Sequence, residues 1–301
     1  MRYVEYFLFV LLGAIVRLFP LRLAQRIGET LGTLMYHVIS VRRVVALENL
    51  RRAFPEKSER EVQAIAKGAF RNFAIAMVEL LWFPRLTRER IEKLVRFKNL
   101  DLMMDAHKQG KGVIMMSGHF GNWELIALSA ALQSNLPLTI IVKTQHNRLI
   151  DGLLNRYRCL HGNRTVPMGI SVREIFSALQ EKRVVAMVAD QSGPRGGLFV
   201  DFFGRPTATH QGPALFSLKT GAPVQMGFLV RQMDGTYEGV FEEVSKEELS
   251  EVTEANIAEL TRRHTKLLEK YVRMYPDHWL WMHRRWKHSE HSGQARAVPI
   301  P

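Results

Sequence analysis

The chain has 301 residues, 47% of them hydrophobic, which is enough to bury a sizeable core and excludes a largely disordered protein. Its single cysteine, Cys159, excludes an intramolecular disulfide and a cysteine-rich metal site. The 42 lysines and arginines exceed the 29 acidic residues and give a formal charge of +13. This charge favours anionic partners, such as phospholipid headgroups, nucleic acid, phosphorylated substrates or an acidic carrier protein.

The first segment is an apolar helix that is too short to span a membrane. It is uncharged from Tyr6 to Val16 and then meets Arg17, whereas a spanning helix needs about 20 apolar residues. It has no small-residue cleavage site of the secretory type. We predict a membrane-associated anchor. The arginines expected to contact lipid phosphates are Arg2, Arg17, Arg22 and Arg26. The alternative is an apolar first helix packed on the domain.

Helical periodicity continues from Leu21 to Phe83. Pro55 interrupts it, and the stretch from Ser58 to Glu61 predicts a capping box that opens the next helix. The pattern then changes to a continuous apolar run bounded by glycines, "GKGVIMMSGHF", which is typical of a strand buried on both faces.

Helices and strands alternate after this run. We predict a helix over 122–132, a strand over 138–143, helices over 147–162 and 171–182, and a buried strand over 183–190. A glycine-rich loop, a helix and a strand follow, then a long helix over 254–276. This order predicts an α/β fold with a mainly parallel central sheet flanked by helices. We assign 1–40 to the anchor and helical lead-in, 41–288 to one catalytic domain and 289–301 to a disordered tail.

His119 and Glu124 form the first candidate site. Five residues of ideal helix turn through about 500°, so the two side chains would not share a helix face. They can meet only if the helix begins after His119, and Gly118 and Gly121 favour such a turn. A carboxylate that accepts a hydrogen bond from one ring nitrogen would leave the other free to take a proton from a hydroxyl. The position at the end of a buried strand suits ligand binding.

Other chemistries are less well supported. Ser117 lies in "MMSGHFG", which is not a G-x-S-x-G elbow, and Cys159 has no carboxylate beside it that would indicate a nucleophile. The sequence has no H-E-x-x-H and no paired cysteines, so we expect no metal at His119 and Glu124. We expect no cofactor. A histidine and a glutamate at this spacing can also be plain structural residues of a turn.

Longer stretches resemble a known family. "GHFGNWE" resembles the H-x4-D/E motif of glycerolipid acyltransferases, in the form found in the bacterial lipid A biosynthesis (late, secondary) acyltransferases. The same branch is similar in "ENLRRAFPEKSERE", "HNRLIDGLLNRYR", "ADQSGPRGGLFVDFFGRPTATHQGPALFSLKTGAPV" and "YPDHWLWMHRRWK", which together span nearly all of residues 40 to 288.

The resemblance implies an inner-membrane enzyme that moves a fatty acyl chain from acyl carrier protein to a hydroxyl of a lipid A precursor. It implies that His119 is the general base and Glu124 its orienter, with no acyl-enzyme intermediate. The arginine of the branch falls at Arg156, with Arg158 as second choice, and its Asp-Gln pair falls at Asp190 and Gln191. The E-G-T-R stretch of the glycerol-phosphate acyltransferases is absent, which argues against that activity.

Further residues are predicted to contact the substrate or the membrane. Asn122 lies within the motif, and a basic cluster that suits phosphates or an acidic carrier comprises Lys143, Arg148, Arg156, Arg158 and Arg164. Its alternative is a solvated helix face. Asp190 could bind substrate, brace Arg195 or be purely structural, and the glycines beside Arg195 suggest a mobile loop. The tryptophans Trp279, Trp281 and Trp286 suit either a membrane interface or a cap on the core.

The leading hypothesis is therefore an acyltransferase at the cytoplasmic face of a bacterial inner membrane, with inner-membrane phospholipids as its surroundings. One alternative is the same chemistry on another lipid acceptor: an aminolipid, a glycolipid or a phosphatidylinositol mannoside. A more remote one is a basic membrane-surface or nucleic-acid binding module, but no recognition helix or RNA-binding motif is evident, so we predict no nucleic-acid partner.

Overall fold

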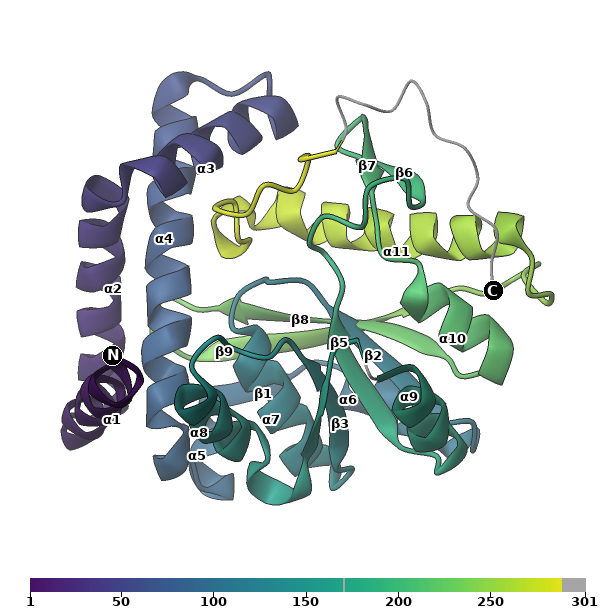
Figure 1. The fold of residues 1–301 in the computed structure, drawn as a ribbon, viewed down its shortest axis with the longest axis horizontal. Helices are drawn as coiled ribbons and strands as arrows, with labels where there is room; N and C mark the ends of the chain where they lie inside the picture. The colour runs from purple at the N-terminus through teal and green to yellow at the C-terminus, as the bar shows by residue number, and fades with distance from the viewer. Residues whose placement is uncertain (170, 289–301) are drawn as a thin grey trace.

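A seven-stranded, mainly parallel sheet forms the centre of the protein (Figure 1). The computed structural model describes residues 1–169 and 171–288. In spatial order the strands are β1 (Val95–Phe97), β9 (Tyr237–Val244), β8 (Val224–Arg231), β2 (Val113–Ser117), β5 (Val184–Val188), β3 (Leu138–Val142) and β4 (Arg164–Pro167). Neighbouring strands run parallel except β8 and β9. The predicted α/β class with a mainly parallel sheet flanked by helices is confirmed.

Alternate side chains of the central strands enter different parts of the core, as the two-residue period of a strand requires. Val113 and Met115 of β2 pack with residues of helices α6 (Leu100–Lys108) and α7 (Trp123–Ser134). Ile114 and Met116 belong to a larger cluster that includes residues of α9 (Ser171–Gln180), α10 (Gly212–Thr220) and α11 (Glu254–Met274). Both faces of the sheet are therefore covered, which explains the continuous apolar runs in the sequence.

Four helices form an amino-terminal layer beside the sheet: α1 (Arg2–Leu18), α2 (Leu21–Val38), α3 (Ser40–Ala53) and α4 (Glu59–Trp82). Ser58 and Glu61 form the predicted capping box at the start of α4, and α3 ends just before Pro55. Helix α2 packs backbone to backbone against α4, because a Cβ on Gly32 would lie 2.5 Å from the Cα of Arg71. The helical prediction from Leu21 to Phe83 is confirmed.

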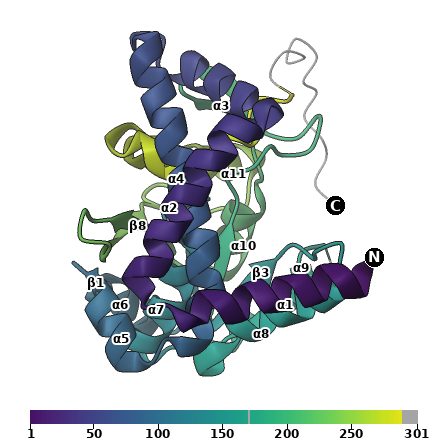
Figure 2. The ribbon, with the colours of Figure 1, turned by 90° about the vertical axis from the view of Figure 1, so that its left-hand side faces the viewer.

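Helix α1 crosses the lower end of this layer and runs beside α8 (Arg148–Arg158) (Figure 2). Gly13 and Val16 are buried, while the outward face exposes large apolar side chains, among them Phe7, Leu8 and Leu12. Arg17, which was predicted to meet lipid phosphates, is half-buried, and its Nη1 donates to the Leu81 carbonyl and the Tyr157 hydroxyl. Within residues 1–169 and 171–288, none of the helices combines the length and the apolar character needed to cross a bilayer.

The remaining elements are short or follow the predicted order. Helix α5 (Arg88–Leu94) precedes β1, and three short 3₁₀ helices occupy η1 (Phe83–Arg85), η2 (Leu160–Gly162) and η3 (Pro276–His278). The segment that the sequence indicated as a glycine-rich loop contains a small antiparallel hairpin, β6 (Phe199–Phe202) and β7 (Arg205–Ala208). The predicted tail, 289–301, lies outside the described residues.

Candidate active site

The register of two neighbouring strands brings His119 and Asp190 together. Ser117 at the end of β2 pairs with Val188 at the end of β5. His119 and Asp190 each follow two residues later, so they leave the same edge of the sheet side by side. This is the carboxyl edge of parallel strands, where open α/β sheets bind ligands.

The imidazole of His119 is held by the carboxylate of Asp190. Its Nδ1 lies 2.7 Å from Asp190 Oδ1, and its backbone amide donates to Oδ2 at 2.7 Å. Because an ionised carboxylate only accepts hydrogen bonds, Nδ1 carries a proton and Nε2 is left as the basic nitrogen of the neutral ring. The side-chain amide nitrogen of Gln191, Nε2, lies 3.5 Å from His119 Nε2. The His119 side chain is 20% exposed, so the ring is partly open to solvent at the carboxyl edge of the sheet.

Opposing effects set the charge of this pair. Burial favours neutral imidazole, but the negative charge of Asp190, its hydrogen bond and the charge of Glu124 together raise the pKa of His119 above 6.5. Burial would likewise raise the pKa of Asp190, yet His119 and the indole of Trp279 lower it to about 2. Trp279 Nε1 donates to Asp190 Oδ2 at 2.8 Å. The carboxylate therefore stays ionised and increases the basicity of the histidine.

The predicted direct hydrogen bond between His119 and Glu124 is absent among the interactions of the described chain, and Glu124 has another partner. Its two oxygens accept from Nε and Nη2 of Arg158 at 2.8 and 2.7 Å. Both side chains are nearly buried. Such a two-point pair fixes the orientation of both groups. The expectation that Glu124 holds the His119 ring by a hydrogen bond is thus corrected, because Asp190 occupies the ring nitrogen that Glu124 was expected to bind.

The turn around His119 has the geometry that the five-residue spacing required. Helix α7 begins at Trp123, so the histidine stands outside the helix and Glu124 lies in its first turn. Gly121 has φ +55°, and a Cβ there would lie 1.8 Å from the Leu229 carbonyl oxygen. At Gly118 a Cβ would lie 2.7 Å from a methyl carbon of Leu268. Gly121 is needed for the close approach of this loop to the β8 backbone, whereas a side chain at position 118 would require Leu268 to shift.

Asn122 lies inside the protein and not at the substrate. It is 0% exposed, its Oδ1 accepts from the Leu125 amide at 2.9 Å, and its Nδ2 donates to Glu79 at 2.6 Å. The prediction that Asn122 contacts substrate is therefore wrong, because no part of the side chain is accessible. The residue caps α7, which is the common role of asparagine before a helix.

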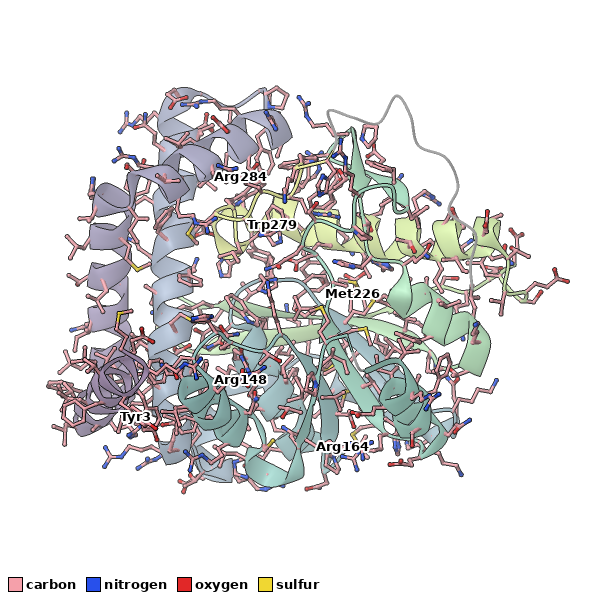
Figure 3. The ribbon with its side chains drawn as sticks, viewed as in Figure 1. Tyr3, Arg148, Arg164, Met226, Trp279 and Arg284 are labelled. Carbon is pink, nitrogen blue, oxygen red and sulfur yellow. The ribbon has the colours of Figure 1, made fainter. Side chains whose placement is uncertain are left out.

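The predicted basic cluster is divided by the fold. Arg158 pairs with Glu124, whereas Arg156, the first choice for the family arginine, is exposed on the same helix. Lys143 and Arg148 are exposed beyond the carboxyl end of β3. Arg164 starts β4, where it hydrogen-bonds Thr139 at the amino end of β3, and Figure 3 shows it far from Trp279. Arg164 does not join the others, because parallel strands send its end of β4 to the opposite edge.

The carboxyl-terminal segment forms a buried floor under the turn that carries His119. Phe120 and Trp279 form an antiparallel bridge, Gly121 donates to the His278 carbonyl at 2.7 Å, and Leu280 donates to the His119 carbonyl at 3.1 Å. Trp279, Trp281 and Trp286 are 0% to 3% exposed. They therefore belong to the core and do not face a membrane interface. Sequence reasoning missed both this support and the His119–Asp190 pair, although each of those two residues follows a buried strand by two positions.

Arg285 belongs to the same floor. Its guanidinium donates to the carbonyls of Gln191 and Ala208 and to the Thr209 hydroxyl. It is 1% exposed, and burial lowers its pKa to about 10 against the opposing charge of Asp190. Arg195 is exposed, and its predicted contact with Asp190 is not among the interactions of the described chain. No group of three or more potential metal ligands occurs within residues 1–169 and 171–288.

Comparison with known proteins gives a consistent result. Residues 1–288 match the family described as bacterial lipid A biosynthesis acyltransferase. The chain belongs to this family. It is 28% identical over 265 residues to the lipid A biosynthesis palmitoleoyltransferase of Escherichia coli K12, covering 87% of this chain and 84% of the relative. It is 26% identical over 273 residues to the lipid A biosynthesis lauroyltransferase of that organism, covering 89% and 86%.

A second group of relatives differs in its acceptor. The chain is 22% identical over 229 residues to the phosphatidylinositol mannoside acyltransferase of Mycolicibacterium smegmatis, covering 74% of this chain and 72% of the relative. Membership of the family makes this chain an acyltransferase, and the acceptor named for its relatives differs between the two groups.

Proposed function

We propose that this chain transfers a fatty acyl group from acyl carrier protein to a hydroxyl of a lipid A precursor, with His119 as general base. The observation that carries the proposal is the hydrogen bond from His119 Nδ1 to the buried carboxylate of Asp190. It leaves Nε2 to take the acceptor proton, in the arrangement that activates hydroxyl groups in other enzymes.

The reaction balances without an acyl-enzyme. The acceptor oxygen attacks the thioester carbonyl carbon as its proton passes to His119 Nε2. The tetrahedral intermediate then expels the carrier thiolate, which recovers the proton from the imidazolium, so the products are an ester and a free thiol. Asp190 holds the ring and stabilises the imidazolium, and the negative charge of Glu124, which Arg158 holds in place, also favours the imidazolium.

The proposals for the acyl donor and for the membrane-facing surface are based on the charge and the exposure of side chains. Lys143, just after β3, and Arg148 and Arg156 on α8 are exposed and offer positive charge to an acidic carrier. The outward faces of α1, α2 and α3 carry most of the exposed large apolar side chains of the described chain. We propose that these faces lie in the headgroup region of the bacterial inner membrane on its cytoplasmic side, with Arg2, Arg22 and Arg26 exposed beside them.

The test is acyl transfer by the purified full chain. Lauroyl acyl carrier protein and lauroyl coenzyme A are each supplied with a lipid A precursor or a phosphatidylinositol mannoside, and products are identified by mass spectrometry. We expect an acylated lipid A precursor from the carrier thioester and a loss of about 10³-fold or more in His119→Ala. His107→Ala, on α6, is the control. Normal transfer by His119→Ala would refute the mechanism, and acylation of the mannoside alone would refute the acceptor.

Membrane association has its own test. The double variant Leu8→Glu with Leu12→Glu places two charges on the exposed face of α1, and we expect it to float with anionic vesicles far less than the natural chain. The control introduces the same charges at Met233 and Val252, which are exposed elsewhere. Equal flotation of both variants would contradict the proposed orientation.

A further inference from the structure

Glu79 is a buried carboxylate that the chemistry above does not use. It lies near the end of α4 and is 2% exposed. It accepts hydrogen bonds from Gln25 Nε2 at 2.7 Å, Asn122 Nδ2 at 2.6 Å and the Tyr237 hydroxyl at 2.7 Å. One side chain thus joins α2, α4, the start of α7 and β9. Burial raises the pKa of this carboxyl, while its three hydrogen bonds favour the ionised form, so its partners indicate what it holds in place.

The direction of these hydrogen bonds is fixed by other contacts. Asn122 uses its oxygen to cap α7 by accepting from the Leu125 amide, so its NH₂ group must face Glu79. Gln25 donates from the same nitrogen to the Gly235 carbonyl at 2.8 Å, so its NH₂ group also faces Glu79. Two amides therefore present donors to position 79, and only a group that accepts at both oxygens satisfies them.

Asn122 connects Glu79 with the reacting groups. It lies three residues after His119 and two before Glu124. The intervening backbone is held from the other side by His278 and Leu280: the Gly121 amide donates to the His278 carbonyl, and the Leu280 amide donates to the His119 carbonyl. Glu79 supplies the hold on the α4 side. A shift of Asn122 would move the first turn of α7, and with it Glu124, relative to the histidine.

We propose that Glu79 is a positioning residue for acyl transfer, which holds Asn122 and thereby sets the His119 to Glu124 turn against α2 and β9. This inference rests on the proposed function. It extends the site to α2, the helix whose opposite face exposes Leu23, Leu31 and Leu34. Helix α2 is thereby linked through Gln25, Glu79 and Asn122 to the turn that carries the base.

The decisive experiment reverses one hydrogen bond. Glu79→Gln sets an NH₂ group against that of Asn122 or of Gln25, and Asn122→Asp sets two carboxylates against each other. The double variant restores the bond, because the introduced glutamine can donate to the introduced aspartate, which still caps α7. We expect each single variant to lose about 10²-fold in kcat with a KM within about twofold of the natural value. We expect the double variant to recover kcat to within about fivefold.

The readouts separate positioning from stability. All proteins are assayed with lauroyl acyl carrier protein and lipid A precursor at a temperature where circular dichroism shows each to be folded. Asn99→Asp is the matched control, since Asn99 also bonds buried backbone through its amide, at Phe241 on β9, and has no hydrogen bond to the described residues 117–124. We expect it to lower the unfolding temperature and leave kcat unchanged.

Each outcome has a definite meaning. A natural chain that transfers no acyl group refutes the proposed function. A natural chain that is active, with Glu79→Gln at full kcat or a double variant no better than the singles, refutes the positioning role alone. Loss of kcat in both singles and recovery in the double variant support it.

Discussion

Two carboxylates flank the turn that carries His119, and they differ in their partners. Asp190 is bonded to His119 and Trp279, whereas Glu124 is occupied at both oxygens by Arg158. Spacing in the sequence favoured Glu124 as the partner of the histidine, yet strand register gave that place to Asp190. The comparison shows that a carboxylate near a base can act through a hydrogen bond or only through its field, and that these roles respond differently to substitution.

The largest expected effect follows from replacing Asp190. In Asp190→Asn the amide no longer favours the tautomer with a basic Nε2 and no longer stabilises the imidazolium, so we expect kcat to fall by about 10³- to 10⁴-fold. The measurement is single-turnover acyl transfer with the folded variant. Asp201→Asn, at an exposed aspartate on β6, is the control and should retain full activity. A loss below tenfold would return Glu124 to the role of orienter.

The second prediction concerns the ion pair between Glu124 and Arg158. Arg158→Ala leaves Glu124 without its partner in a nearly buried position, and we expect about a 10- to 10²-fold fall in kcat/KM. Arg158→Lys keeps the charge but loses the two-point geometry, so it should fall between Arg158→Ala and the natural chain. Arg156→Ala on the same helix is exposed and should change little. The reverse ranking of the two arginines would show that Arg156 is the functional one.

The third prediction concerns pH. The pKa of His119 is raised above 6.5 by Asp190 and, to a smaller extent, by Glu124, and only the neutral ring can accept a proton. Activity should therefore rise with pH through a pKa above 6.5. Glu124→Gln removes one negative charge that favours the imidazolium, so the acid limb of kcat/KM should move to lower pH. A limb that moves to higher pH, or stays in place, would show that the field of Glu124 does not reach the base.

The smallest expected effect tests the support of Asp190. Trp279→Phe keeps an aromatic ring in the buried floor but removes the indole donor to Oδ2. Since His119 still bonds both oxygens, we expect only about a three- to tenfold loss in kcat. Trp286→Phe has no such bond to lose, because its indole nitrogen is buried without a partner in the described chain, and it serves as the control. Equal losses in both variants would assign the effect to packing alone.

Much of the fold followed from local patterns. The continuous apolar runs at 113–117 and 184–188 predicted strands covered on both faces, and the capping box at Ser58 predicted the start of α4. The position of His119 before α7 followed from its distance to Glu124 and from Gly121. These features depend on residues close in the chain, which is why they could be predicted. The hairpin β6–β7 was missed because its strands have four residues each.

The sequence by itself determined the α/β class, the histidine at a strand end and the family motifs around it. Only the tertiary structure decided which carboxylate binds that histidine, that Arg158 and not Arg156 faces the site, and that the tryptophans are buried while the face of α1 is exposed. Both terminal regions contain aromatic and basic residues, so the local pattern does not distinguish the buried region from the exposed one. The physical reason is that burial and partner choice depend on strand register and helix packing between residues as far apart as 119 and 190.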